Sequence, residues 1–165
     1  MNRMLCERTA CERFATLFWA VFDTERRTLH YVNAGHPAPM LIRREEGRVE
    51  RLDEGGPVLG LLSNARYSAG MVHVADLDTL VLYSDGITEA ASENEEFGDA
   101  RVQRAIADIL DATPERICSR ILAEVSSFAT DEVPQDDCTL MVVNFRRPEG
   151  HVRDWKAEGV GVATV

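Results

Sequence analysis

The feature of this 165-residue sequence that most constrains its fold is the order in which its hydrophobic pattern changes period. Up to residue 83, short apolar segments of strand length alternate with turns rich in Gly, Pro and acidic residues. Between residues 102 and 128 apolar residues recur at helical spacing, and residues 138–145 form one last apolar segment. This order predicts an α+β fold in which helices cover a mostly antiparallel sheet.

The predicted strands are short and end at recognisable turns. Residues 14–22 read FATLFWAVF, which predicts a strand buried on both faces. A polar turn and an alternating segment at residues 28–33 follow, so these two segments predict an antiparallel hairpin. Further strands are expected at residues 39–43, 48–52, 66–74, 79–83 and 138–145.

Two amphipathic helices are expected after Gly98. In the first, Asp99 is the predicted N-cap. The second begins at Thr113-Pro114-Glu115, where an N-cap, a proline in the first turn and an acid near the positive end of the helix dipole follow one another. We expect the apolar stripes of both helices to pack into the core.

Charge and cysteine content narrow the function classes. Lys and Arg number 18 against 28 Asp and Glu, which gives a formal net charge of −10. Such a surface repels phosphate backbones, so we do not expect nucleic-acid binding. The acidic residues are expected either to keep the protein soluble or to bind divalent cations. The four cysteines form no C-x-x-C pair, no apolar run reaches about 20 residues, and residues 1–13 hold no signal peptide. A reduced, cytoplasmic protein is expected.

Several common catalytic motifs are absent from the sequence. It contains neither a phosphate-binding G-x-x-x-x-G-K-[ST] loop nor a dinucleotide-binding G-x-G-x-x-G turn. It also lacks a G-x-S-x-G nucleophile elbow and an H-E-x-x-H zinc motif. These absences leave acidic residues at strand ends as the main candidates for chemistry.

Two acidic positions flank predicted strands. Asp85 follows the strand at residues 79–83, and we expect Gly86 to let the chain turn sharply behind it. Asp136 and Asp137 come just before the strand at residues 138–145. Carboxylates brought together at the edge of a sheet would hold a hard divalent cation. The alternative is that these residues only form turns, because Asp is common in turns.

The segment Asn33-Ala34-Gly35-His36-Pro37 interrupts the strand pattern. A histidine beside a Gly-Pro turn is suited to orienting a phosphate or a water molecule. The alternative is a loop residue whose hydrogen bonds are structural. The residues alone leave both interpretations of His36 open.

Five motifs, in order and at suitable spacings over residues 14–145, resemble the stage II sporulation protein E-like phosphatases. This is a bacterial branch of the metal-dependent PPM (protein phosphatase 2C) superfamily. The motifs are FATLFWAVFD, LHYVNAGHPAPMLIR, GGPVLGLL, DTLVLYSDGITEAASENEEFG and PQDDCTLMVV.

The resemblance implies an αββα sandwich of mostly antiparallel sheets with a binuclear Mn²⁺ or Mg²⁺ centre. It implies hydrolysis of phosphoserine or phosphothreonine on a bacterial regulatory protein, for example a phosphorylated anti-sigma-factor antagonist. The implied nucleophile is a metal-bound water, and no side chain takes that role. Asp85 and Asp136 match metal-binding positions and Asp137 neighbours one; the residues implied near the centre are Asn33, Gly35, His36 and Gly86.

The sequence departs from the family pattern at its beginning. Residues 1–13 hold none of the Asp-rich motif with which the catalytic domain normally starts, and they resemble the loop before the first strand. We therefore expect a lead-in at residues 1–13, the C-terminal two-thirds of a phosphatase-like domain at residues 14–146, and a flexible tail at residues 147–165.

This departure has consequences for function. We expect the chain alone to be weakly active or inactive, because it has few carboxylates with which to hold two cations. Exposed apolar surface is expected to promote self-association. The alternative function is a non-catalytic pseudophosphatase that docks a partner in a signalling pathway.

Overall fold

The structure is a computed structural model that describes residues 1–8, 13–92, 95–129, 137–147 and 160–164. The chain divides into two compact units. The first unit comprises Met1–Ala38 and Leu52–Val74, and the second comprises Pro39–Arg51 and Ala75–Val165. Each unit is described by itself below.

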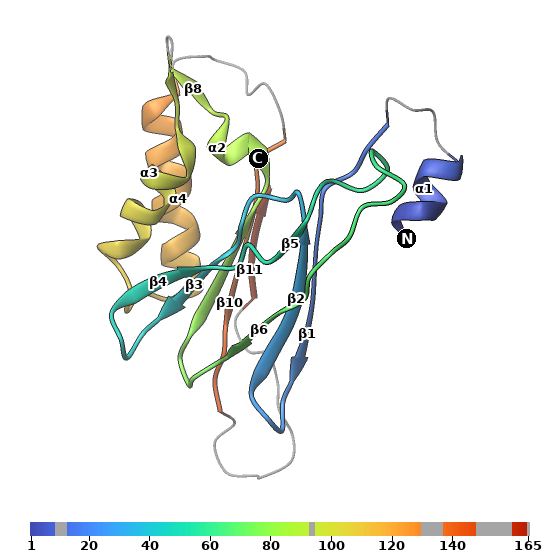
Figure 1. Ribbon diagram of the computed structural model, residues 1–165. Helices are drawn as coiled ribbons and strands as arrows, with labels where there is room; N and C mark the ends of the chain where they lie inside the picture. The colour runs from blue at the N-terminus through green and yellow to red at the C-terminus, as the bar shows by residue number, and fades with distance from the viewer. Residues whose placement is uncertain (9–12, 93–94, 130–136, 148–159, 165) are drawn as a thin grey trace. The chain divides into compact units, whose positions relative to one another are not determined.

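A four-stranded sheet forms the first unit, together with helix α1 (Asn2–Arg8) (Figure 1). Strands β1 (Leu17–Asp23) and β2 (Thr28–Ala34) pair in antiparallel register, so the predicted hairpin is confirmed. Strand β6 (Gly70–His73) pairs antiparallel with β2, and the short β5 (Gly55–Gly56) runs parallel to the end of β2.

The prediction that the first strand is buried on both faces is wrong. Trp19 and Val21 point to one face of β1 and are 54% and 47% exposed. On β2, Leu29 and Tyr31 are buried, and Phe18 stacks on the Tyr31 ring with 5.6 Å between centroids. A continuously apolar strand cannot distinguish its two faces in sequence, because alternation is the only signal of side.

A five-stranded, fully antiparallel sheet forms the second unit, with the strand order β11-β10-β7-β3-β4. Its strands are β3 (Met40–Arg43), β4 (Arg48–Arg51), β7 (Thr79–Tyr83), β10 (Thr139–Asn144) and β11 (Val160–Thr164). Four of these were predicted within two residues of their bounds. The fifth, β11, lies in the segment expected to be a flexible tail, where weak patterning gave no strand signal.

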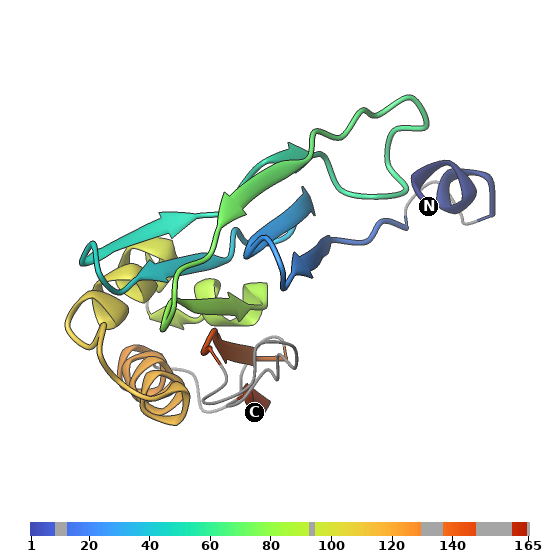
Figure 2. The same cartoon turned by 90° about the horizontal axis from the view of Figure 1, so that it is seen from below.

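Helices α3 (Gly98–Ala107) and α4 (Pro114–Phe128) lie along one face of the five-stranded sheet (Figures 1 and 2). Before them come the short helix α2 (Asp85–Thr88) and a small hairpin of β8 (Ala91–Ser92) and β9 (Glu95–Glu96). The buried core is shared by helices and strands, and includes Met40, Ile42, Val81, Ile106, Ile117, Ile121, Leu140 and Val142. The mixed α+β class with mostly antiparallel sheets is therefore confirmed.

The two helix starts had different outcomes. Thr113 caps α4 as predicted, since its hydroxyl accepts a hydrogen bond from the Arg116 N–H at 3.4 Å. Asp99 is not the N-cap of α3, which is Phe97. Asp99 lies inside the first turn of α3. Its carboxylate accepts a hydrogen bond from the Tyr83 hydroxyl and forms an ion pair with the Arg51 guanidinium.

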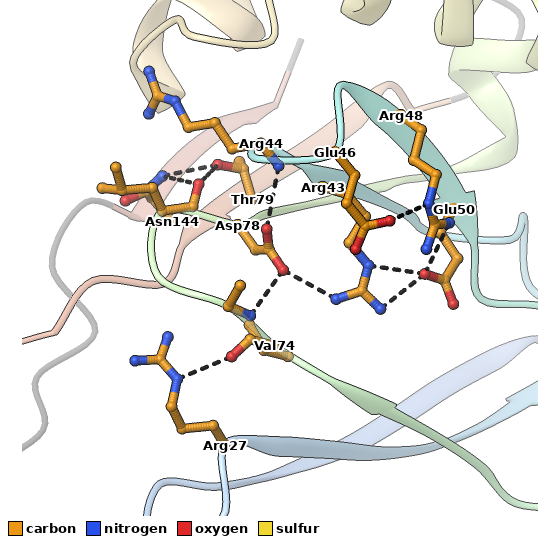
Figure 3. A network of polar contacts seen from close by, with 12 residues as sticks. Arg27, Arg43, Arg44, Glu46, Arg48, Glu50, Val74, Asp78, Thr79 and Asn144 are labelled. Carbon is orange, nitrogen blue, oxygen red and sulfur yellow. Dashed lines mark hydrogen bonds and ion pairs between the residues drawn. The ribbon is translucent and has the colours of Figure 1, made fainter.

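A buried ion-pair network braces one end of the second unit (Figure 3). The Asp78 carboxylate, 1% exposed, accepts hydrogen bonds from Arg43 at 3.0 Å and from the backbone N–H groups of Arg44 and Ala75 at 3.2 and 2.9 Å. Arg43 also pairs with Glu50 at 2.8 Å. The network joins β3 and β4 to the turn before β7.

The lead-in also differs from its prediction as a loop, because Asn2–Arg8 forms helix α1. Its first turn is anchored by Asn2, whose side chain donates to Leu62 O and accepts from the Gly60 N–H, both at 2.8 Å. Among the described residues, no helix combines the length and the apolar character needed to cross a membrane.

Candidate functional site

Asp85 is the first residue of α2, directly after strand β7. Ser84 has extended backbone angles and ends the strand as the helix N-cap. The Asp85 Oδ1 accepts a hydrogen bond from the Gly86 N–H at 3.1 Å, which fixes the carboxylate against the start of the helix. The expected sharp glycine turn is wrong: Gly86 is buried inside α2 and does not adopt positive φ.

The backbone of Asp137 lies next to Ser84, the residue that precedes Asp85, because Ser84 ties the two segments together. The Ser84 hydroxyl donates to Asp137 O and accepts from the Thr139 N–H, each at 2.8 Å. The Ser84 N–H donates to Thr139 O at 2.9 Å and so extends the pairing of β7 with β10. The two predicted acidic positions, Asp85 and Asp137, therefore belong to the same edge of the five-stranded sheet.

The two carboxylates have an environment that suits a cation. Asp85 is half-buried and forms no ion pair with any basic side chain among the described residues, and Asp137 is exposed. Carboxylate oxygens are the ligands that hard divalent cations prefer. No group of three acidic, His or Cys side chains suited to a metal occurs among the residues whose placement is described. Asp136 lies outside those residues, so its assignment stays a prediction.

Ser84 is the site residue that sequence reasoning missed. A serine between a strand and an aspartate is typical of a helix N-cap, and Ser84 does occupy that position. Its side chain makes no capping hydrogen bond, however, and bonds to the segment before β10. The available signal was position: a hydroxyl at the end of β7 faces the start of β10 once the two strands are paired. The pairing of β7 with β10 joins segments far apart in the chain, so a local sequence pattern does not predict it.

Two buried side chains support this edge from within the second unit. The Cys138 thiol donates to Gly86 O at 3.1 Å and so links the start of β10 to α2. The Tyr83 hydroxyl donates to Asp99 at 2.9 Å, and Arg51 pairs with the same carboxylate at 2.7 Å. Burial, followed by the hydrogen bond to Asp99, raises the pKa of Tyr83 far above its usual range, so its phenol stays protonated.

In the first unit, Asn33, Gly35 and His36 form one braced turn. The Asn33 side chain, 5% exposed, accepts from the His36 N–H at 2.8 Å and donates to His36 O at 2.9 Å. Gly35 has φ 71°, and a Cβ there would lie 2.4 Å from Val58 Cγ1, so the turn requires glycine. The His36 Nδ1 lies 3.4 Å from the Thr16 hydroxyl. A role for His36 toward phosphate or water stays a prediction.

Comparison with known proteins connects these features to a family. The sequence profile of the family described as Stage II sporulation protein E (SpoIIE) matches residues 1–146. Protein IcfG of Synechocystis sp. is 33% identical over 131 residues, covering 79% of this chain and 20% of IcfG. Phosphoserine phosphatase RsbU of Bacillus subtilis is 24% identical over 143 residues, covering 87% of this chain and 42% of RsbU. The chain thus spans less than half the length of either relative.

The fold also has a solved counterpart. The phosphatase domain of the cell fate determinant SpoIIE from Bacillus subtilis superposes with a TM-score of 0.64 at 18% identity. The match covers 82% of this chain and 59% of that domain. At this identity the likeness establishes the fold alone.

Proposed function

Because this chain belongs to the stage II sporulation protein E (SpoIIE) family, we propose that it is part of a metal-dependent protein phosphatase. The substrate class is phosphoserine or phosphothreonine on a bacterial regulatory protein, such as a phosphorylated anti-sigma-factor antagonist. The observation that carries the proposal is the position of Asp85 and Asp137 at one sheet edge, tied together by Ser84. The relative RsbU, named a phosphoserine phosphatase, supports the substrate class.

Asp85 and Asp137, with Asp136 by motif, are the residues that would hold Mn²⁺ or Mg²⁺. A bound cation supplies positive charge to phosphoryl oxygens and lowers the pKa of water, which makes hydroxide available near neutral pH. The described residues contribute two carboxylates here, which is a ligand set for one cation more readily than for two. The solved SpoIIE domain was presoaked with manganese, which favours Mn²⁺ as the first cation to test.

The protein's own groups prepare the edge for this role. The Gly86 N–H engages Oδ1 of Asp85, while Oδ2 has no hydrogen-bond partner among the described residues. That oxygen is therefore available as a ligand without breaking an existing bond. The carboxylates would repel a phosphorylated side chain on their own, so substrate affinity should depend on the divalent cation.

Phosphate release from a phosphoserine peptide in the presence of Mn²⁺ tests the proposal. Asp85→Asn should lower both Mn²⁺ affinity and phosphate release by at least about 10–100-fold, the scale seen when the surroundings of a metal ligand are altered. Asp108→Asn is the matched control, because Asp108 is an exposed acid at the end of α3. Its substitution should leave both quantities unchanged.

Two outcomes would contradict the proposal. The first is phosphate release that survives Asp85→Asn or chelation of the cation. The second is a chain that neither binds Mn²⁺ nor releases phosphate, which would favour the non-catalytic docking module. Under the same proposal the protein acts in the cytoplasm, where Cys6, Cys118 and Cys138, all free thiols, stay reduced.

A further inference from the structure

The antiparallel pair of β7 and β10 changes its hydrogen bonding where β7 ends. In such a pair, two opposite residues of the hydrogen-bonded type exchange two backbone bonds, each N–H donating to the carbonyl of the other. Ser84 and Thr139 follow the last register pair and are opposite each other, and the Ser84 N–H donates to Thr139 O at 2.9 Å as this pattern requires. The Thr139 N–H, however, donates to the Ser84 hydroxyl at 2.8 Å. The side chain of Ser84 therefore takes the acceptor role that its own carbonyl would normally have.

The carbonyl of Ser84 serves the helix that follows. Ser84 O accepts a hydrogen bond from the Ile87 N–H at 3.1 Å, within the first turn of α2. A strand carbonyl points across to the neighbouring strand, whereas a helix carbonyl points along the helix axis. Because the hydroxyl accepts the bond from β10, the carbonyl is available to α2. The chain thus passes from strand to helix at a single residue, and Asp85 becomes the first residue of α2 directly at the sheet edge.

The same hydroxyl also holds the segment that contains the second acid. A serine hydroxyl has one hydrogen to donate and two lone pairs to accept with, so it can form both kinds of bond at once. The Ser84 hydroxyl donates to Asp137 O at 2.8 Å while it accepts from the Thr139 N–H. This carbonyl belongs to the peptide group that follows Asp137, so the bond fixes the backbone of Asp137 at the edge. One side chain therefore sets the backbone of both acidic segments.

A second bond holds the chain on the other side of Asp85. The Cys138 thiol, in a residue that is 7% exposed, donates to Gly86 O at 3.1 Å. The residues immediately before and after Asp85 are thus both bound to the segment 137–139 through a side chain. Neither bond uses the Asp85 carboxylate, which accepts the Gly86 N–H on Oδ1. The backbone around Asp85 is fixed without occupying its second carboxylate oxygen.

We propose that Ser84 is a positioning residue of the acidic edge. Its hydroxyl replaces its carbonyl in the pairing of β7 with β10, lets α2 begin at Asp85, and holds the backbone of Asp137. Without the hydroxyl, the carbonyl at position 84 would be the one acceptor left for both N–H groups that Ser84 now serves separately. The consequence for a cation rests on the proposed phosphatase function, in which Asp85 and Asp137 are the ligands.

Amide hydrogen exchange of the metal-free chain, followed by NMR, tests the positioning itself. In Ser84→Ala the N–H groups of Thr139 and Ile87 compete for one carbonyl. At least one of the two should exchange at least about tenfold faster, because it loses its acceptor. Ser84→Thr keeps a hydroxyl at the same place and should restore slow exchange at both. Unchanged exchange of both amides in Ser84→Ala would overturn the proposal.

Thr79→Val is the matched control. Thr79 lies at the other end of β7, opposite Asn144, and its hydroxyl accepts a hydrogen bond from the Asn144 side chain at 2.8 Å. This variant also removes a hydroxyl that links β7 to β10, but far from Asp85 along the strand. Exchange at Thr139 and Ile87 should stay slow. Equal acceleration in Thr79→Val and Ser84→Ala would overturn the positioning role, since it would show a general loss of sheet stability.

Mn²⁺ affinity, measured by titration calorimetry, tests the consequence for a cation. Ser84→Ala should weaken Mn²⁺ binding by about tenfold, the lower end of the range for residues that orient metal ligands. Ser84→Thr should restore the affinity, and Thr79→Val should leave it unchanged. Unchanged affinity in Ser84→Ala, despite faster amide exchange, would overturn the role toward the cation. If the unaltered chain bound no Mn²⁺, the phosphatase proposal would fail, and amide exchange would still decide whether Ser84 positions the two segments.

Discussion

The two sheets of this protein have similar hydrophobic content and different cover. In the five-stranded sheet, Met40, Leu41 and Ile42 of β3 are all 0% exposed, and α3 and α4 pack on one face. In the four-stranded sheet, Trp19 and Met71 remain 54% and 65% exposed on one face. Apolar strands show where a sheet forms, but what packs on each face determines which side chains become buried. Stability should therefore reside mainly in the five-stranded sheet.

The largest expected effect is on the buried ion pair of the helix-covered unit. Asp78→Ala should lower the free energy of unfolding by about 3–5 kcal/mol, because it removes one of the two carboxylates that pair with the buried Arg43 and leaves two backbone N–H groups without their acceptor. Urea denaturation measures this. The exposed Glu46–Arg48 pair is the control, where Glu46→Gln should have a much smaller effect on the free energy of unfolding, because solvent screens the pair. A similar loss of unfolding free energy in both variants would contradict the expected difference between the buried and the exposed ion pair.

The core beneath α4 is the next test. Ile121 is 0% exposed, so Ile121→Ala should cost about 3 kcal/mol through lost transfer energy and a cavity. The comparison variant is Val21→Ala on β1, where the side chain is 47% exposed and the loss should stay below about 1 kcal/mol. An equal loss at both positions in denaturant titrations would show that the β1 face is covered in solution.

A smaller effect is expected at the start of α4. Thr113→Ala removes the acceptor for the Arg116 N–H and should lower the free energy of unfolding by about 1 kcal/mol. Thr113→Ser keeps a hydroxyl and should restore most of it. Thermal unfolding followed by circular dichroism can compare the two. Indistinguishable melting temperatures for the two variants would show that the hydrogen bond from the Thr113 hydroxyl does not stabilise α4.

The smallest effect should be on the exposed face itself. Met71→Lys replaces a largely exposed side chain and should change the free energy of unfolding by no more than about 0.5 kcal/mol. The same denaturation measurement applies. A loss of several kcal/mol would mean that Met71 is buried in the folded protein, and the comparison of the two sheets would fail.

Local sequence patterns were sufficient for much of the fold. The hairpin of β1 and β2 was predicted from an alternating segment after a polar turn, and the start of α4 from the residues Thr113 to Glu115. Helix α1 and strand β11 were not predicted, because neither segment has a strong period. The exposed face of β1 was also missed, since a uniformly apolar run carries no information on which side is covered.

For the candidate site, the sequence indicated the acidic positions, whose role stays a prediction, and did not indicate the contacts around them. Asp85 and Asp137 stand next to strands whose positions were predicted, whereas their common sheet edge comes from the pairing of β7 with β10 in the structure. Ser84 could not be assigned a partner, because its bonds to Asp137 and Thr139 cross 53 and 55 positions of sequence. Likewise, Asp99 was predicted to be a helix N-cap, because its contacts with Tyr83 and Arg51 depend on the fold and are not visible in the local sequence.

We propose that the sheet edge carrying Asp85 and Asp137 is a specific cation site and more than a part of an acidic surface. Mn²⁺ is paramagnetic, so substoichiometric Mn²⁺ titrated into isotope-labelled protein broadens the amide signals nearest to it. We predict early loss of the signals of Ser84, Gly86 and Cys138, with the exposed acidic turn at Glu45 and Glu46 unaffected, and no such loss in Asp85→Asn. Uniform broadening over all acidic surfaces, unchanged by Asp85→Asn, would contradict the account.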